Sequence, residues 1–93
     1  MPLQHVTGKI HGHIILYALS TCGWCRMTKK LLNELGIDYY YTDVDQLSGD
    51  ERSEAAKAIK KWNPEQSLPI MVIDDKKAIV GYQEEAIRAS FKI

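Results

Sequence analysis

The stretch "STCGWCRMTKK", residues 20–30, holds both cysteines of the chain, Cys22 and Cys25, with two residues between them. Three kinds of chemistry use such a closely spaced pair: a disulfide that staples the fold, half of a metal site, or a redox couple. Each needs a different structural setting, so the residues on either side of the pair must decide among them.

The cysteines stand where a predicted strand gives way to a predicted helix. Residues 12–19, "GHIILYAL", form a short apolar run that is typical of a buried strand. After the first cysteine the apolar residues recur at helical spacing, and Gly36 is a natural end for that helix. This apolar stripe consists of Trp24, Met27, Leu31, Leu32 and Leu35. Lys29 and Lys30 are expected on a solvated face near Cys25, where they could also stabilise its thiolate or steer an acidic partner. We therefore expect Cys22 at a helix N-terminus.

The rest of the chain predicts three more strands and two more helices. The spacing of Ser48 and Glu51 is that of a capping box, which would open the first of these helices. The elements are expected at residues 37–44 (strand), 48–62 (helix), 68–74 (strand), 78–80 (strand) and 83–91 (helix). The order β-α-β-α-β-β-α predicts an α/β fold whose mixed, four-stranded sheet is flanked by helices, with the first two strands parallel.

Length and composition indicate one folded domain over residues 1–93, in which residues 1–12 form a flexible arm or a short extra strand. Twelve basic and twelve acidic side chains cancel, which argues against a dedicated nucleic-acid or membrane surface. No apolar run approaches the roughly 20 residues of a membrane-spanning helix, and the first residues lack the pattern of a secretion signal. The expected location is cytoplasmic, where disulfides rarely serve as scaffolding.

Two of the three chemistries fit the pair poorly. A bridge across so short a loop would contribute roughly 2 kcal/mol at best to stability. A structural zinc site needs four ligands, and the pair supplies two. His5, His11 and His13 could complete such a site in principle, but we expect these scattered N-terminal side chains to be solvated.

The redox interpretation has positive support. Free N–H groups and the helix dipole at a helix N-terminus favour an anion, and this field lowers the pKa of a thiol placed there. The thiolate is the species that attacks a disulfide. One turn later, Cys25 is placed to attack the mixed disulfide that Cys22 forms. The sequence therefore predicts a thiol–disulfide oxidoreductase.

Three motifs, in this order and at these distances, resemble those of the glutaredoxin family within the thioredoxin-fold superfamily. They are "LYALSTCGWC" (residues 16–25), "SLPIMVID" (67–74) and "IVGYQEE" (79–85). The resemblance implies a thioredoxin-like fold of the glutaredoxin type, with Cys22 as the nucleophile and Cys25 as the resolving thiol. It further implies reduction of protein or glutathione disulfides.

The resemblance also implies a binding site for substrate or glutathione. In the family the proline of the second motif is cis and faces the active site, so Leu68 and Pro69 would flank the substrate. The third motif would place Gly81, Tyr82 and Gln83 at the γ-glutamyl end of glutathione. Trp24, between the cysteines, would lie at the surface and contact partners. Tyr82 could pack under the site or touch substrate.

Departures from the family pattern bear on the electron donor. Gly23 and Trp24 replace the usual Pro-Tyr, and Leu19 stands where many dithiol members carry a lysine for glutathione. No cofactor is required. Glutathione is one possible donor, and a thioredoxin-reductase-type or other disulfide reductase is another, with ribonucleotide reductase among the substrates of a related branch. The alternative function is an iron–sulfur carrier or sensor, in which Cys22 would ligate a [2Fe–2S] cluster.

Overall fold

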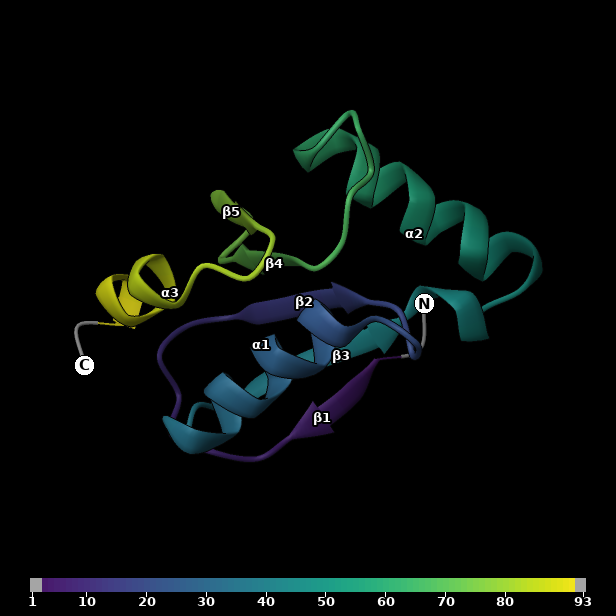
Figure 1. The fold of residues 1–93 in the computed structure, drawn as a ribbon. Coiled ribbons are helices and arrows are strands. Elements are labelled where there is room, and N and C mark those ends of the chain that lie inside the picture. The colour runs from purple at the N-terminus through teal and green to yellow at the C-terminus, as the bar shows by residue number, and fades with distance from the viewer. Residues whose placement is uncertain (1–2, 92–93) are drawn as a thin grey trace.

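A computed structural model describes residues 3–91 of the chain and consists of a mixed sheet flanked by helices (Figure 1). Within these residues the five strands are ordered β1-β3-β2-β4-β5 across the sheet. The strands are β1 (Gln4–Val6), β2 (Ile14–Ala18), β3 (Tyr39–Asp43), β4 (Ile70–Ile73) and β5 (Lys77–Val80). The helices are α1 (Gly23–Glu34), α2 (Gly49–Trp62) and α3 (Glu84–Phe91), with a 3-10 turn η1 (Val44–Gln46) before α2.

The strand pairing confirms the predicted topology and adds one strand to it. β2 and β3 are parallel, while β4 pairs antiparallel with both β2 and β5. The sheet has five strands and not four, because the short extra strand that was one of two expectations for residues 1–12 forms as β1 and pairs antiparallel with the outer edge of β3. β1 spans only Gln4–Val6, and two of its three residues are exposed. So short a segment carries no alternating pattern that would reveal a strand.

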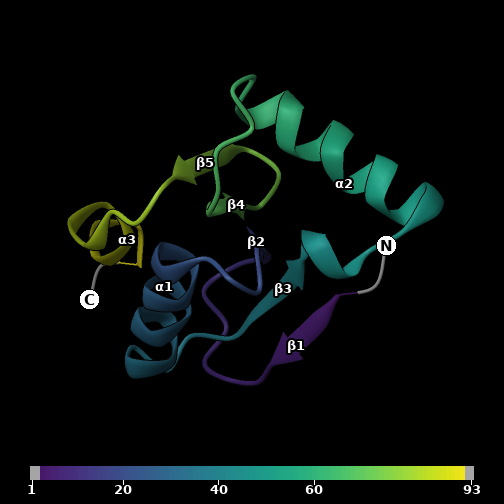
Figure 2. The same cartoon turned by 45° about the vertical axis from the view of Figure 1, so that its right-hand side comes forward.

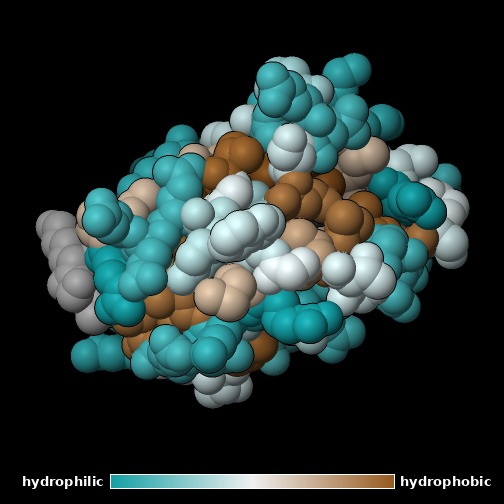
Figure 3. Space-filling model, in the orientation of Figure 1, coloured by the Kyte–Doolittle hydropathy of each residue, from teal (hydrophilic) through white to brown (hydrophobic). Residues whose placement is uncertain are grey.

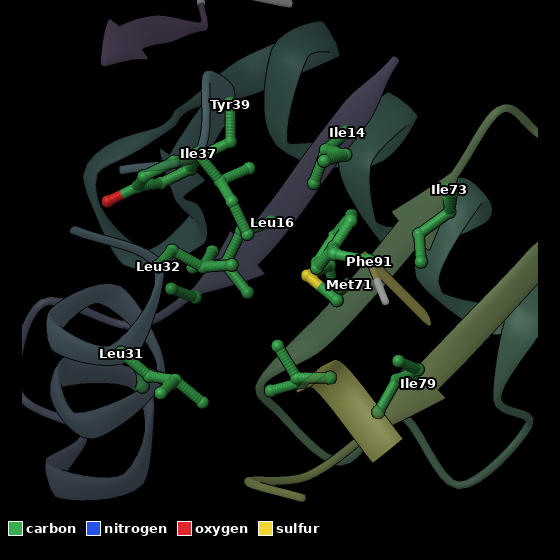
Figure 4. Packing of buried hydrophobic residues seen from close by; sticks show 13 residues of the cluster. Ile14, Leu16, Leu31, Leu32, Ile37, Tyr39, Met71, Ile73, Ile79 and Phe91 are labelled. Carbon is green, nitrogen blue, oxygen red and sulfur yellow. The ribbon is translucent and has the colours of Figure 1, made fainter. Parts of the chain in front are cut away.

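Helices cover both faces of the sheet, and the alternation of side chains along each strand supplies a core to each face (Figure 2). On one face, Ile14 and Leu16 of β2 pack with residues of α1 and α3. Figure 4 shows Leu31 and Leu32 of α1 directed toward this cluster. On the other face the core consists of Tyr17, Ile59, Ile70 and Val72, with Trp62 packed against it. Trp62 is therefore a packing residue, as the helical spacing predicted.

Of two helix ends predicted from the sequence, the C-terminal stop of α1 is confirmed and the N-terminal cap of α2 is not. Gly36 adopts a left-handed φ of +67° directly after α1, which confirms it as the stop. Ser48 occupies the N-cap of α2, but its side chain makes no capping hydrogen bond, so the predicted capping box is wrong. Gly49 has a φ of +60°, and the chain turns there instead of presenting Ser48 to the first turn of the helix.

The surface mixes polar and apolar residues. On the face shown in Figure 3, hydrophobic patches are separated by hydrophilic side chains. Within residues 3–91, no helix has the length and apolar character needed to cross a membrane.

His5 joins β1 to the loop before β3 while 42% of its side chain stays exposed, as expected for a solvated histidine. Its Nε2 lies 2.9 Å from Asp38 Oδ1, and its ring stacks on Tyr40 with 4.5 Å between centroids. The N–H of Gly8 donates to the same Asp38 oxygen at 3.1 Å. The hydrogen bonds from His5 and Gly8 lower the pKa of Asp38 below its ordinary value of 3.8.

We expect the attachment of β1 to weaken in acid. Because the pKa of Asp38 is lower in the folded chain, its carboxylate stabilises the fold above pH 3.8, and this contribution is lost as the pH falls through the folded value. Thermal unfolding should therefore show that wild type melts at a higher temperature than Asp38→Asn, and that this difference in melting temperature becomes smaller as the pH falls. Asp75→Asn is the control for losing one exposed carboxylate. A difference in melting temperature that increases in acid would contradict the stabilising role of the Asp38 carboxylate.

Candidate functional site

Cys22 caps the N-terminus of α1, where the sequence placed it. Its backbone is extended (φ −86°, ψ 120°), and its Sγ accepts a hydrogen bond from the Cys25 N–H at 3.2 Å. This N–H is one of the donors that the first turn of a helix leaves without an intrahelical partner. The side chain of Cys22 is partly exposed. A thiolate at this position would be both reachable and stabilised by a backbone donor.

Cys25 lies one turn further on and is only 1% exposed. Burial raises the pKa of its thiol from 9.0 to about 12, and a hydrogen bond with Cys22 adds to the rise. The backbone of Leu19 and the charge of Lys29 act in the opposite direction. Cys25 is consequently a protonated, protected thiol beside an accessible one.

A cavity of about 270 Å³ lies next to the cysteine pair. Trp24 is 64% exposed and stacks on Tyr82, with ring centroids 5.8 Å apart and 20° between the planes. A cis peptide bond joins Leu68 to Pro69, as the resemblance implied. The cavity is lined by five of the six residues predicted to bind substrate or glutathione: Trp24, Leu68, Pro69, Gly81 and Tyr82. Motifs far apart in the sequence therefore meet at one surface.

The turn after β5 shapes the far side of this cavity. Gly81 has a φ of +81°, which favours glycine, and its N–H donates to the carbonyl of Pro69 at 2.7 Å. Gln83, the sixth predicted residue, lies outside the cavity and donates its side-chain amide to the Val80 carbonyl. Burial, reinforced by the charge of Glu84, raises the pKa of Tyr82.

The loop that leads into Cys22 is held by a carboxylate from η1. Asp45 accepts hydrogen bonds from the backbone N–H of Ser20, at 2.9 Å, and from its hydroxyl group. The Gln46 amide also donates to the Ser20 hydroxyl. These bonds from Ser20 lower the pKa of Asp45. The loop before Cys22 is thus held by a residue that follows β3, the parallel neighbour of β2.

Lys29 does not lie on a solvated face, which corrects the expectation for this residue. Its Nζ is 2.9 Å from Asp43 Oδ1 and 4.2 Å from the centre of the Tyr41 ring. The side chains of Lys29 and Asp43 are only 23% and 21% exposed. A cation is therefore held in place on the helix that carries both cysteines. Lys30 is exposed, as expected.

The described residues do not group into a metal site. Among residues 3–91, no three or more His, Cys, Asp or Glu side chains are grouped so that they could hold a metal ion. One thiol is partly exposed and the other is buried. A [2Fe–2S] cluster needs four ligands. Because Cys25 is buried, the described part of the chain would supply only one of them, Cys22.

A family model described as glutaredoxin matches residues 14–78, which is more than half of the chain. The chain belongs to the glutaredoxin family. Members of this family are thiol–disulfide oxidoreductases, and the matched segment includes the cysteine pair and Pro69.

Two solved Methanosarcina proteins share this fold closely. The glutaredoxin of Methanosarcina mazei Go1 is 47% identical, with a TM-score of 0.92 over 98% of this chain and 88% of that chain. Methanosarcina acetivorans methanoredoxin is 45% identical, with a TM-score of 0.89 over 92% and 90% of the two chains. The fold class expected from the sequence is confirmed, apart from the added strand.

Curated relatives match over a shorter segment. Glutaredoxin 1 of Rickettsia felis is 32% identical over 62 residues, which cover 67% of this chain and 58% of the relative. The chain spans about half to three fifths of the length of the first plant and bacterial glutaredoxins that it matches.

Sequence reasoning missed the carboxylates that support the glutaredoxin site. Asp43 and Asp45 come from the end of β3 and from η1, more than a dozen residues after the cysteines. One signal was available, because the first two strands were predicted to be parallel. The carboxyl ends of parallel neighbours lie at the same edge of a sheet, and Ala18 is indeed paired with Asp43. Polar residues just after both strands were therefore candidates for contact.

Proposed function

We propose that this chain is a dithiol oxidoreductase that reduces protein or glutathione disulfides through Cys22 and Cys25. The observation that carries the proposal is the contrast between the two thiols. Cys22 is reachable and accepts a backbone hydrogen bond at a helix N-terminus, whereas Cys25 is buried beside it with its pKa raised to about 12. Cys22 is placed to attack the substrate disulfide, and Cys25 is placed to attack the mixed disulfide that results.

The first step joins Cys22 to the substrate. The Cys22 thiolate attacks one sulfur of the substrate disulfide, and the substrate S–S bond breaks. One substrate thiolate leaves and takes up a proton, while the other sulfur stays bound to Cys22 as a mixed disulfide. The cavity lined by Trp24, Pro69 and Tyr82 includes the residue between the two cysteines and would hold the substrate chain.

The second step releases the product. Cys25 loses its proton and attacks Cys22 Sγ, so the Cys22–Cys25 disulfide forms and the second substrate thiolate leaves and is protonated. The substrate disulfide has gained two electrons, and the dithiol has lost two. Two thiol equivalents from a donor then reduce the internal disulfide and complete the cycle.

Glutathione is the donor and small substrate that the site supports best. The backbone of Leu68 makes no backbone hydrogen bond within residues 3–91, so it is free to pair with an extended peptide at the cavity. Gly81 and Tyr82 line the other side of that cavity. A buckwheat glutaredoxin that is 26% identical, with a TM-score of 0.64, was solved as a complex with glutathione. A dedicated disulfide reductase is the competing donor, and the cytoplasmic location and the protein substrate stay predictions.

The redox titration of the pair tests this proposal. Wild type is equilibrated in glutathione redox buffers of increasing oxidising strength, quenched with acid and alkylated, and its intact mass is measured. We expect it to pass from two free thiols to one internal disulfide. We expect Cys25→Ser to accumulate a stable adduct of one glutathione on Cys22, because no thiol remains to resolve it. Unreacted thiols in the most oxidising buffer would contradict the proposal.

Two further outcomes of the same titration discriminate among the remaining alternatives. A wild type that forms the internal disulfide while Cys25→Ser gains glutathione only sluggishly would favour a dedicated reductase as donor. Thiols that resist oxidation, together with visible absorbance and dimerisation after anaerobic reconstitution with iron and sulfide, would favour the iron–sulfur alternative.

A further inference from the structure

Lys29 is a fixed cation that the two-step exchange has not yet used. Its ammonium group is bound by Asp43 at 2.9 Å and lies over the Tyr41 ring at 4.2 Å. Both partners belong to β3, which pairs with β2 immediately before the cysteine loop. Because the Lys29 side chain is only 23% exposed, its charge is screened less by water than that of a freely solvated lysine.

The position of Lys29 on α1 brings that charge within electrostatic reach of Cys25. The two residues are four apart on one helix, so their side chains lie on the same face, with about 5–6 Å between Cβ atoms. Lys29 is also among the groups that act on the thiol of Cys25, and it favours the thiolate form. Other ionisable groups near this pair include Cys22 at the N-cap of α1, and Tyr39, Tyr41 and Asp43 on β3.

The remaining neighbours of Cys25 bring no competing charge. Ile87 and Phe91 of α3 enter the same core as Cys25, and both are apolar. The charged residues of α3 are Glu84, Glu85 and Arg88, of which Glu84 and Arg88 bind each other at 3.1 Å. The cation of Lys29 is therefore the positive group best placed to act on the buried sulfur.

The second step of exchange is the one that needs a cation here. Once Cys22 is bound to substrate it no longer carries a negative charge, yet Cys25 must become a nucleophile inside the core. We propose that Lys29, held by Asp43 and Tyr41, is a positioning residue for this step and stabilises the negative charge that develops on Cys25 Sγ. The inference rests on the proposed function and assigns a residue to its resolving step.

Asp43 makes the proposal sharply testable, because its charge has the opposite sign. Removing the Lys29 cation should disfavour the Cys25 thiolate, whereas removing the Asp43 carboxylate should favour it. In Asp43→Asn the new side chain would still offer an amide oxygen to Lys29, and the Tyr41 ring would still hold the ammonium group. Lys29→Met and Asp43→Asn therefore break the same ion pair but should move the resolving step in opposite directions.

The experiment separates the two steps with dithiobis(nitrobenzoate), an aromatic disulfide that releases a coloured thiolate. Attack by Cys22 releases the first coloured thiolate at a rate that depends on reagent concentration. Attack by Cys25 on the resulting mixed disulfide releases the second at a rate that does not. Stopped-flow absorbance is recorded over a pH series for wild type, Lys29→Met, Lys29→Arg and Asp43→Asn, and thermal unfolding checks each fold.

We expect the second phase of Lys29→Met to be about 3- to 10-fold slower at neutral pH, with its pH midpoint raised. Asp43→Asn should accelerate that phase by about 2- to 3-fold and lower the midpoint, because one opposing charge is gone. Lys29→Arg should stay within about 2-fold of wild type, since the cation is kept. The first phase should change little in all three variants.

A purely structural role would give a different pattern. If Lys29→Met and Asp43→Asn slow the second phase alike, or if Lys29→Met leaves it unchanged, the inference is overturned while the proposed function stands. If wild type releases one coloured thiolate or none, the proposed function fails and takes the inference with it. The two failures are therefore distinguishable in one data set.

Discussion

Cys22→Ser should abolish disulfide reduction. Serine replaces the only accessible thiol with a hydroxyl group that stays protonated at neutral pH, so no nucleophile is left to open the substrate disulfide. Cys25 cannot substitute for it, because that thiol is 1% exposed and its pKa is raised to about 12. Turnover of a glutathione mixed disulfide should fall by more than about a hundredfold, to the background of the assay.

The serine variant is also a clean test of chemistry, because it preserves the structure. Cys22 is the N-cap of α1, and serine is among the preferred N-cap residues, so its hydroxyl oxygen can accept the Cys25 N–H in place of Sγ. Thermal unfolding should therefore show an intact fold. Cys25→Ser is the matched control, because it keeps the first attack. Turnover of Cys22→Ser close to that of wild type would refute the assignment of the nucleophile.

Leu32→Ala should produce the largest loss of stability among single changes on α1. The Leu32 side chain is fully buried between α1 and the sheet, where it packs with Leu16 and Ile37 in the main core (Figure 4). Truncation removes buried methyl groups and leaves a cavity that close-packed neighbours fill only in part. The free energy of unfolding should fall by about 2–5 kcal/mol.

Met27→Ala is the matched control on the same helix. Met27 belongs to the same predicted apolar stripe but is 42% exposed, so its truncation should cost less than about 1 kcal/mol. Urea unfolding of both variants measures the difference. Equal losses for the two would mean that the register of α1 against the sheet is wrong.

Most of the fold could be predicted because the spacing of apolar residues along the chain indicates which side of each strand or helix is buried. The run Ile14 to Ala18 and the stripe through Leu31 and Leu32 each present a continuous surface to the core, and both elements lie where the pattern put them. Periodicity fails where burial does not follow it. Met27 is in the helical register but faces the groove beside Tyr82 and not the sheet.

The candidate site could be predicted only where its chemistry is local in sequence. The cysteine pair identifies itself by spacing, and the motifs around Pro69 and Gly81 carry the family resemblance. Asp43 and Asp45, which hold Lys29 and Ser20 near the cysteine pair, are harder to predict. They act through strand pairing and tertiary contacts, and no local sequence pattern marks either residue. The predicted parallel pairing of the first two strands made them candidates for contact, but the contacts that they make follow from the three-dimensional arrangement.

The short strand β1 has a consequence for the chain's behaviour at high concentration. Without it, the five-residue strand β3 with its three consecutive tyrosines would be the outer edge of the sheet, offering unpaired amides and aromatic rings to any neighbouring molecule. With it, that border consists of three residues, a length too small to recruit another strand firmly. We therefore expect β1 to limit edge-to-edge association of the sheet.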